Sequence, residues 1–297
     1  MSKRVIAVVG ATGHIGTVLT EALLKKGHEV RALGRDQTKL AALASKGAKT
    51  RTAAFDDAAA LTDAFKGADA AFTMIPPSYG EESFSAWQDR SGEAIAKAVS
   101  QAKVKHVVDL SSVGAQHASG TGPITGLHRQ EKRLEALSGL NVLHLRASYF
   151  MENHFWSIPT IKSAGINGSP VKADLVFSQV ATADIGQKAA ERLDRLDFNG
   201  RVVVEFGGPR ELTLKDTTAI LGRAIGKPDL QYVQFPYEDA EKAMAGSGMK
   251  PGTAKLMVEM YRGFNEGLCR PETPIKDRGA VTIEDFAAGF ARAFKAG

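Results

Sequence analysis

The chain has 297 residues, of which 43% are hydrophobic and 24% charged, a composition that is typical of globular proteins and excludes a disordered chain. Lys and Arg number 38 against 33 Asp and Glu, so the formal net charge is +5, and the excess forms no basic run that would favour nucleic acid. Because Cys269 is the single cysteine and no apolar stretch approaches the about 20 residues of a membrane helix, we expect a cytoplasmic protein that is neither secreted nor bound to a membrane.

The first half of the chain alternates short apolar runs with helical patterns. The expected order is strand 5–9, helix 15–26, strand 29–33, helix 38–45, strand 49–54, helix 58–65, strand 70–75, helix 84–101, strand 106–110, helix 130–137 and strand 141–145. Parallel neighbours need a crossover element between them, and buried parallel strands are nearly continuous apolar runs. This order therefore predicts an α/β fold with a doubly wound parallel sheet of the Rossmann type.

Beyond about residue 150 the alternation weakens, and the turn signals Asn167-Gly-Ser-Pro170 and Gly207-Gly-Pro209 appear. Further elements are expected as helix 182–193, strand 201–206, helix 214–225 and helix 283–296. We predict one domain over residues 1–155, completed by part of 174–206, and a smaller α+β domain formed mainly by 156–297. The smaller domain should close over the carboxyl ends of the strands, where such sheets bind ligands.

The strongest chemical signal is Gly10-Ala-Thr-Gly13-His-Ile-Gly16, which directly follows the first predicted strand and opens a helix. Gly10 allows a tight turn, Gly13 lets the backbone approach a pyrophosphate, and Gly16 lets helix and strand pack closely. The amides at the start of the helix then face the anion. A glycine-rich turn of purely structural use is the alternative, but the βαβ context favours a dinucleotide-binding domain over residues 1–155.

The end of the second predicted strand indicates which dinucleotide is bound. NAD-selective sites usually place Asp or Glu there, whereas this chain has Gly34 followed by Arg35, with Lys39 about one helical turn later. Without a carboxylate a 2′-phosphate is not repelled, and Arg35 can bind it through its planar guanidinium. Asp36 disagrees with this interpretation, and the alternative makes both cations ordinary surface residues. We predict that NADP(H) is preferred and that NAD(H) is possible.

Two further segments, Leu110-Ser-Ser112 and Leu145-Arg-Ala-Ser-Tyr-Phe-Met-Glu-Asn153, complete a pattern that resembles the NmrA-like family of atypical short-chain dehydrogenases/reductases over nearly the full length. That family includes NADPH-dependent quinone and related reductases, and also regulators that bind the dinucleotide and catalyse nothing. The resemblance implies cofactor contacts, by position, at Gly10, Thr12, Gly13, His14, Ile15, Gly16, Arg35, Lys39, Phe55, Met74, Ile75, Pro76, Tyr149, Phe150 and Asn153.

Typical short-chain dehydrogenases use a serine with Tyr-x-x-x-Lys, yet none of the five tyrosines here has a lysine four residues on. The corresponding segment contains His128 and Lys132, which share a helix face at this spacing. His128 could donate a proton or bind the nicotinamide ribose, and Lys132 could orient the ribose or bias the histidine. Ser111 or Ser112 could hydrogen-bond a carbonyl, and Ser111 is also expected to contact the cofactor. The alternative is a basic helix start that is simply solvated.

The missing tyrosine favours an easily reduced acceptor, because a quinone that receives a hydride can take its proton from solvent. Tyr149, Phe155 and Trp156 follow the sixth strand and are expected to bind such a flat acceptor, with packing in the core as the alternative. The same absence favours a regulator that senses NADP(H) and acts through a protein partner, which is the alternative function. The seven histidines and one cysteine form no metal motif, and helix 84–101 could form a homodimer surface.

Overall fold

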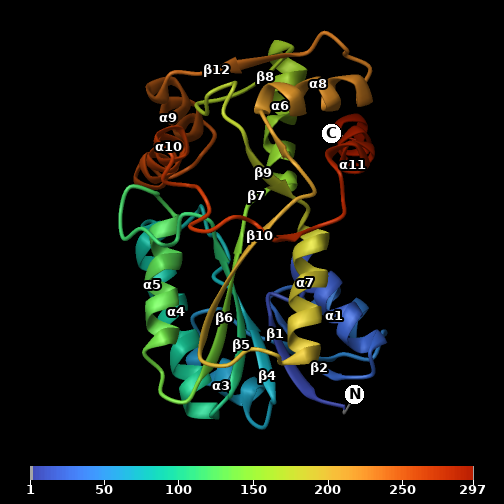
Figure 1. The fold of residues 1–297 in the computed structure, drawn as a ribbon, viewed down its shortest axis with the longest axis vertical. Coiled ribbons are helices and arrows are strands. Elements are labelled where there is room, and N and C mark those ends of the chain that lie inside the picture. Colours follow the sequence, from blue (N-terminus) through green and yellow to red (C-terminus); the bar gives the residue numbers. More distant parts are fainter. Residues whose placement is uncertain (1–2, 297) are drawn as a thin grey trace.

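The large sheet contains eight parallel strands in a computed structural model that describes residues 3–296 (Figure 1). Its spatial order is β3–β2–β1–β4–β5–β6–β10–β13, and every neighbouring pair is parallel. The strands are β1 Val5–Val9, β2 Glu29–Gly34, β3 Lys49–Thr52, β4 Ala70–Thr73, β5 His106–Ser112, β6 Asn141–Ala147, β10 Arg201–Gly207 and β13 Asp277–Arg278. The predicted doubly wound sheet is confirmed.

Helices cover both faces of this sheet because successive strand residues point to opposite sides. Ile6 and Val8 of β1 pack in a core cluster with α1 His14–Lys25, α2 Gln37–Ala44 and α7 Thr182–Arg195. Ala7 and Val9 pack on the other side with α3 Ala58–Phe65, α4 Phe84–Ala102 and α5 Ile124–Glu135. These four of the five β1 side chains are fully buried, as an uninterrupted apolar strand requires.

A smaller part of the chain lies beyond the carboxyl ends of the large sheet (Figure 1). It contains a three-stranded sheet in the order β11–β9–β7 and a two-stranded sheet of β12 and β8. Its elements are β7 Tyr149–Phe150, the 3₁₀ helix η1 Met151–Ser157, α6 Ile158–Ala164, β8 Ile166–Ser169, β9 Phe177–Val180, β11 Glu211–Leu212, α8 Leu214–Ala224, β12 Gln231–Gln234, α9 Tyr237–Gly246, α10 Pro251–Glu266 and α11 Ile283–Ala296. Between these elements the chain returns to the large sheet with α7, β10 and β13.

Most boundaries lie within two or three residues of the sequence prediction, but the predicted start of helix 130–137 is wrong. Helix α5 begins six residues earlier, at Ile124. Glycine and polar residues weaken the helical pattern there, whereas tertiary contacts stabilise the first turns. Ile124 is buried in a core cluster, and the side-chain amide of Gln88 donates to the Pro123 carbonyl at 2.8 Å.

The length and hydropathy of the helices bear on membrane insertion. Within residues 3–296, none combines the length and the apolar composition needed to cross a bilayer.

Candidate functional site

The glycine loop between β1 and α1 forms a cradle that side chains would fill. Gly10 has a φ of +72°, in the left-handed region that favours glycine, and a Cβ there would lie 2.7 Å from the Met74 sulfur. A Cβ on Gly16 would overlap the carbonyl oxygen of Gly10. Gly13 caps α1 without a side-chain hydrogen bond, so the first-turn amides keep their capacity to bind an anion. This arrangement fits a pyrophosphate.

Residues after β2 form the neighbouring part of the cradle. The Arg35 guanidinium lies 5.3 Å from the centre of the Phe55 ring, so two predicted cofactor residues meet. The carboxylate of Asp36 accepts the backbone N–H of Lys39 at 3.0 Å and caps α2. Because Asp36 is used in this cap and Arg35 makes no ion pair with any residue of 3–296, the edge of the cradle fits an additional phosphate.

The loop after β4 borders the same cradle. The Met74 side chain lies against Gly10, where it occupies the space that a larger residue would need, and Ile75 is buried in the core beneath. The carbonyl of Pro76 accepts the indole N–H of Trp87 at 2.9 Å, which attaches this loop to α4. Phe150 of β7 and Asn153 of η1 are half-buried where the chain leaves β6. The predicted cofactor residues are therefore distributed around the carboxyl ends of β1, β2, β4 and β6.

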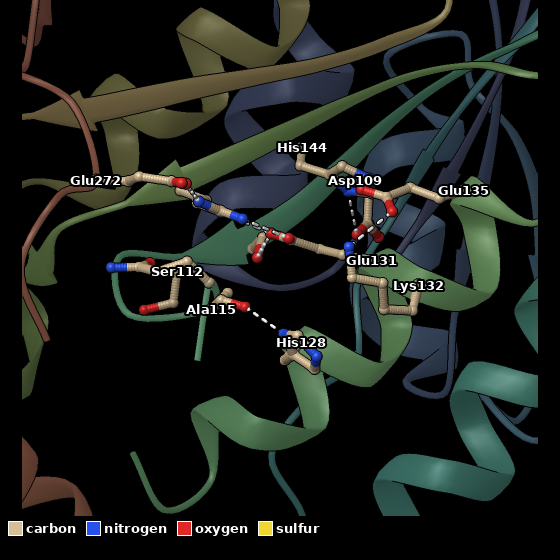
Figure 2. A network of polar contacts seen from close by, with 12 residues as sticks. Asp109, Ser112, Ala115, His128, Glu131, Lys132, Glu135, His144 and Glu272 are labelled. Carbon is tan, nitrogen blue, oxygen red and sulfur yellow. Dashed lines mark hydrogen bonds and ion pairs between the residues drawn. The ribbon is translucent and has the colours of Figure 1, made fainter. Parts of the chain in front are cut away.

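The three predicted catalytic residues have three different hydrogen-bond partners, and Figure 2 shows His128 and Lys132 with theirs. The Nδ1–H of His128 donates to the Ala115 carbonyl at 2.8 Å, which leaves Nε2 as the nitrogen that can face a ligand. The Ser111 hydroxyl donates to Glu131 at 2.6 Å and is buried. Lys132 is exposed and its ammonium pairs with Glu135 at 2.9 Å. The structure does not bring these side chains together as a catalytic group.

Arg146 is the centre of a buried ion-pair network that the sequence prediction missed. Its Nε and Nη2 donate to the two carboxylate oxygens of Glu131, at 2.9 and 2.7 Å, and Glu131 is only 1% exposed. Burial alone would raise the pKa of Glu131, but the hydrogen bonds from Arg146 and Ser111 hold it below its usual value. An arginine inside an apolar strand is the signal that could have revealed the network, since a buried charge requires a partner.

The network continues from Arg146 to its neighbour in register on β10, Glu205, and to Glu272. The Nη1 of Arg146 donates to Glu272 at 2.8 Å and lies 3.6 Å from Glu205. Glu205 accepts the backbone N–H of Glu272 at 3.1 Å, and burial raises the pKa of Glu205 despite these contacts. The segment 269–275, which we call the strap, is therefore attached to β6 and β10 through Glu272.

The strap covers a cavity of about 500 Å³ at the carboxyl ends of β5 and β6. The Tyr149 ring lies 5.5 Å from that of Phe177 and 6.0 Å from that of Phe264, so three aromatic rings wall the cavity. Burial raises the pKa of the Tyr149 phenol well above its usual value, which keeps it neutral. Arg270 and Glu272 of the strap also line the cavity. The aromatic rings and the polar side chains of this lining suit a flat molecule that also carries hydrogen-bonding groups.

Of the three residues predicted to bind substrate, only Tyr149 lines this cavity. Phe155 packs against Phe286 and Phe290 of α11, at ring distances of 5.2 and 6.0 Å. Trp156 is 69% exposed, and its ring meets the edge of Tyr79 at 5.7 Å. The sequence prediction missed the other aromatic walls because they come from β9 and α10, which lie far from Tyr149 along the chain.

Comparison with known proteins places the chain among dinucleotide-binding relatives. Residues 2–288 match the model of the NmrA-like family. The chain is 27% identical to an NAD(P)H azoreductase of Xenophilus azovorans over 98% of this chain and 99% of that protein. It resembles the structure of the Escherichia coli NADPH-dependent quinone oxidoreductase QOR2 in complex with NADPH, with a TM-score of 0.80, 25% identity, and coverage of 96% and 99% of the two chains. The negative transcriptional regulator NmrA in complex with NADP shares the fold, with a TM-score of 0.74, 18% identity, and coverage of 100% and 98%.

Proposed function

Because the chain belongs to the NmrA-like family, we propose that it is an NADPH-dependent reductase that transfers a hydride to a quinone-like or other conjugated small acceptor. The observation that best supports this proposal is that two sites lie on the same edge of the large sheet. The glycine cradle and Arg35 follow β1 and β2, and the aromatic cavity opens after β5 and β6. The similarity to a quinone oxidoreductase and an azoreductase supports this combination.

The residues of this chain have separable roles in the proposed reaction. Bound NADPH would supply the hydride. The amides of the α1 start would bind its pyrophosphate, and Arg35 its 2′-phosphate. Tyr149, Phe177 and Phe264 would hold a planar acceptor and exclude water from one face.

The hydroxyl groups of the two serines at the end of β5 both donate hydrogen bonds to groups of the protein itself. Ser111 donates to Glu131, and Ser112 donates to the Val113 carbonyl at 2.9 Å. An alcohol or ketone substrate would need such a donor, whereas the anion formed by hydride transfer to a quinone can be protonated by water. Because both serine hydroxyls already donate within the protein, we propose an acceptor whose reduced form can take its proton from water.

The test is the loss of reduced-nicotinamide absorbance when purified protein is mixed with NADPH and a panel of quinones and azo dyes, with NADH in parallel. We expect multiple turnovers and a preference for NADPH. Tight binding of NADPH without turnover on any acceptor would contradict the proposal. That result would favour the second candidate, an NADP(H)-sensing regulator, which the bonded serine hydroxyls and the missing Tyr-x-x-x-Lys also favour.

A further inference from the structure

Ser148 has a buried hydroxyl without a partner at the wall of the cavity. The residue connects β6 to β7, is 4% exposed and lines the cavity under the strap. Its backbone N–H donates to the Phe206 carbonyl at 2.9 Å, so the main chain is satisfied. Its Oγ is buried and makes no hydrogen bond with any residue of 3–296. Buried polar groups in folded proteins usually have a partner, and of the thirteen buried side-chain atoms without one in residues 3–296, Ser148 Oγ is the one that belongs to the cavity lining.

A second serine of the same cavity lining has a hydroxyl group that does form a hydrogen bond within the protein. Ser178 of β9 also lines the cavity, and its Oγ accepts the backbone N–H of Gly208 at 3.0 Å. Ser178 therefore holds two segments of the protein together, whereas the Ser148 hydroxyl holds nothing within the described chain. The difference indicates that the partner of Ser148 is a molecule that enters the cavity.

We propose that Ser148 determines specificity by donating a hydrogen bond to a carbonyl oxygen of the acceptor, an inference that rests on the proposed function. A hydroxyl is a neutral donor, and the aromatic walls around it suit a conjugated ring that carries a carbonyl. The charged side chains of the lining are the carboxylates of Glu211 and Glu272 and the guanidinium of Arg270, and their negative sum disfavours an anionic ligand. The ligand class is therefore a neutral conjugated carbonyl compound.

The same bond would strengthen during the reaction. The hydride of NADPH carries two electrons to the acceptor, NADP⁺ remains, and the carbonyl oxygen becomes an oxyanion that water protonates. The Ser148 O–H bond stays intact throughout. A donor already aimed at this oxygen stabilises the developing charge more than it stabilises the ground state.

The experiment compares Ser148→Ala with wild type, using 1,4-naphthoquinone and naphthalene as probes that share a shape and differ in their oxygens. Binding is measured calorimetrically to the NADP⁺ complex, which cannot transfer a hydride. We expect Ser148→Ala to weaken naphthoquinone binding by about 3- to 10-fold and to leave naphthalene binding within about 2-fold. The melting temperature should be unchanged or higher, because the variant removes an unpaired hydroxyl.

Ser178→Ala is the matched control. It removes the Gly208 hydrogen bond, so we expect a lower melting temperature without selective loss of the quinone. Equal naphthoquinone affinity in Ser148→Ala and wild type would overturn the inference, as would an equal loss of both probes. If wild type binds naphthoquinone in a Ser148-dependent manner but transfers no hydride from NADPH, the proposed function fails and the inference stands.

Discussion

Gly34 limits how the cofactor preference can be altered, because the Thr12 side chain occupies the space that a side chain at position 34 would need. A Cβ at position 34 would lie 2.9 Å from both Oγ1 and Cγ2 of Thr12. The short threonine side chain cannot move away from such a contact. The carboxylate that NAD-selective sites place at this position therefore does not fit beside Thr12.

We predict that Gly34→Asp destabilises the protein by about 1–3 kcal/mol and fails to improve NADH binding, since the overlap displaces the glycine loop. The double variant Thr12→Ala/Gly34→Asp should recover most of the stability. Gly252→Ala is a control, because a Cβ there meets no atom within 4 Å. Chemical unfolding and NADH titration measure these effects, and tight NADH binding by the single variant would contradict the prediction.

Arg35 should discriminate between the two reduced cofactors. We predict that Arg35→Ala weakens NADPH binding by about 10- to 100-fold, the range for a lost charge-assisted hydrogen bond, and NADH binding by less than about 2-fold. Lys39→Ala should have a smaller effect, because the Lys39 side chain is 66% exposed and its charge is better screened. Fluorescence titration measures both affinities, and an equal loss of NADPH and NADH would refute the 2′-phosphate role.

At the scale of elements, Arg146 joins α5, β6, β10 and the strap through carboxylates that differ in exposure. Glu131 is buried, whereas the Glu272 side chain is 59% exposed. We predict that Glu131→Gln lowers the free energy of unfolding by about 3 kcal/mol, because it uncouples a buried charge pair. Glu272→Gln should lower it by less than about 1 kcal/mol, as an exposed pair does.

Urea unfolding of the two variants tests this difference, with hydrogen exchange of residues 269–275 as a second readout. Glu272→Gln should accelerate exchange in the strap while the large sheet stays protected, because the ion pair attaches the strap to β6. Equal losses of stability in both variants, or an unchanged exchange rate in the strap, would contradict this account of the network.

The elements around the glycine loop could be predicted because their signals are local. A buried apolar strand, three glycines and a helix lie within a short stretch, and α1 and α3 begin and end where the helical pattern predicts or within a residue of it. Gly34 followed by Arg35 is equally local. Such features depend on neighbours along the chain, which a single sequence contains.

The acceptor cavity could not be predicted because its walls meet only in three dimensions. Tyr149, Phe177 and Phe264 come from three separate elements, and β9 is a short strand without a strong alternating pattern. The burial of Glu131, the hydrogen-bond partner of Ser111, could not be predicted for the same reason. Glu131 follows the helical pattern of a solvated residue, and only the packing of α5 against Arg146 shows that it is buried.

At the scale of the whole molecule, the chain leaves the large sheet after β6 and returns through α7, β10 and β13, so the two parts do not fold from separate halves of the sequence. Inside the smaller part, a hydrogen-bonded chain joins η1, β9 and α8. His154 lies 2.8 Å from the Gln179 carbonyl oxygen, and the Gln179 amide donates to the Thr217 hydroxyl at 2.9 Å. Since Gln179 offers an oxygen, the His154 Nε2 carries the proton.

Global stability should therefore fall in mild acid. Burial lowers the pKa of His154 from 6.5 to about 4, so the unfolded chain binds the extra proton more readily between these values. The contribution of neutral His154 to the free energy of unfolding is complete above pH 6.5. It is lost as the pH falls toward 4, by at most about 3 kcal/mol. Burial also lowers the pKa of His106, which adds a slope of the same sign.

His154→Gln isolates the contribution of His154, because an amide can still donate to Gln179 and does not titrate. The free energy of unfolding in urea is measured for both proteins from pH 7 to pH 4.5. We predict that the loss on acidification is smaller in the variant and that the difference between the two curves changes mainly below pH 6.5. Acidic groups with lowered pKa, such as Glu131, titrate in the unfolded chain near pH 4.5, whereas buried carboxyls with raised pKa, such as Glu205, are present in both proteins and cancel in the difference between the two curves. Parallel curves for the two proteins would show that His154 is not the buried neutral group on which this pH dependence rests.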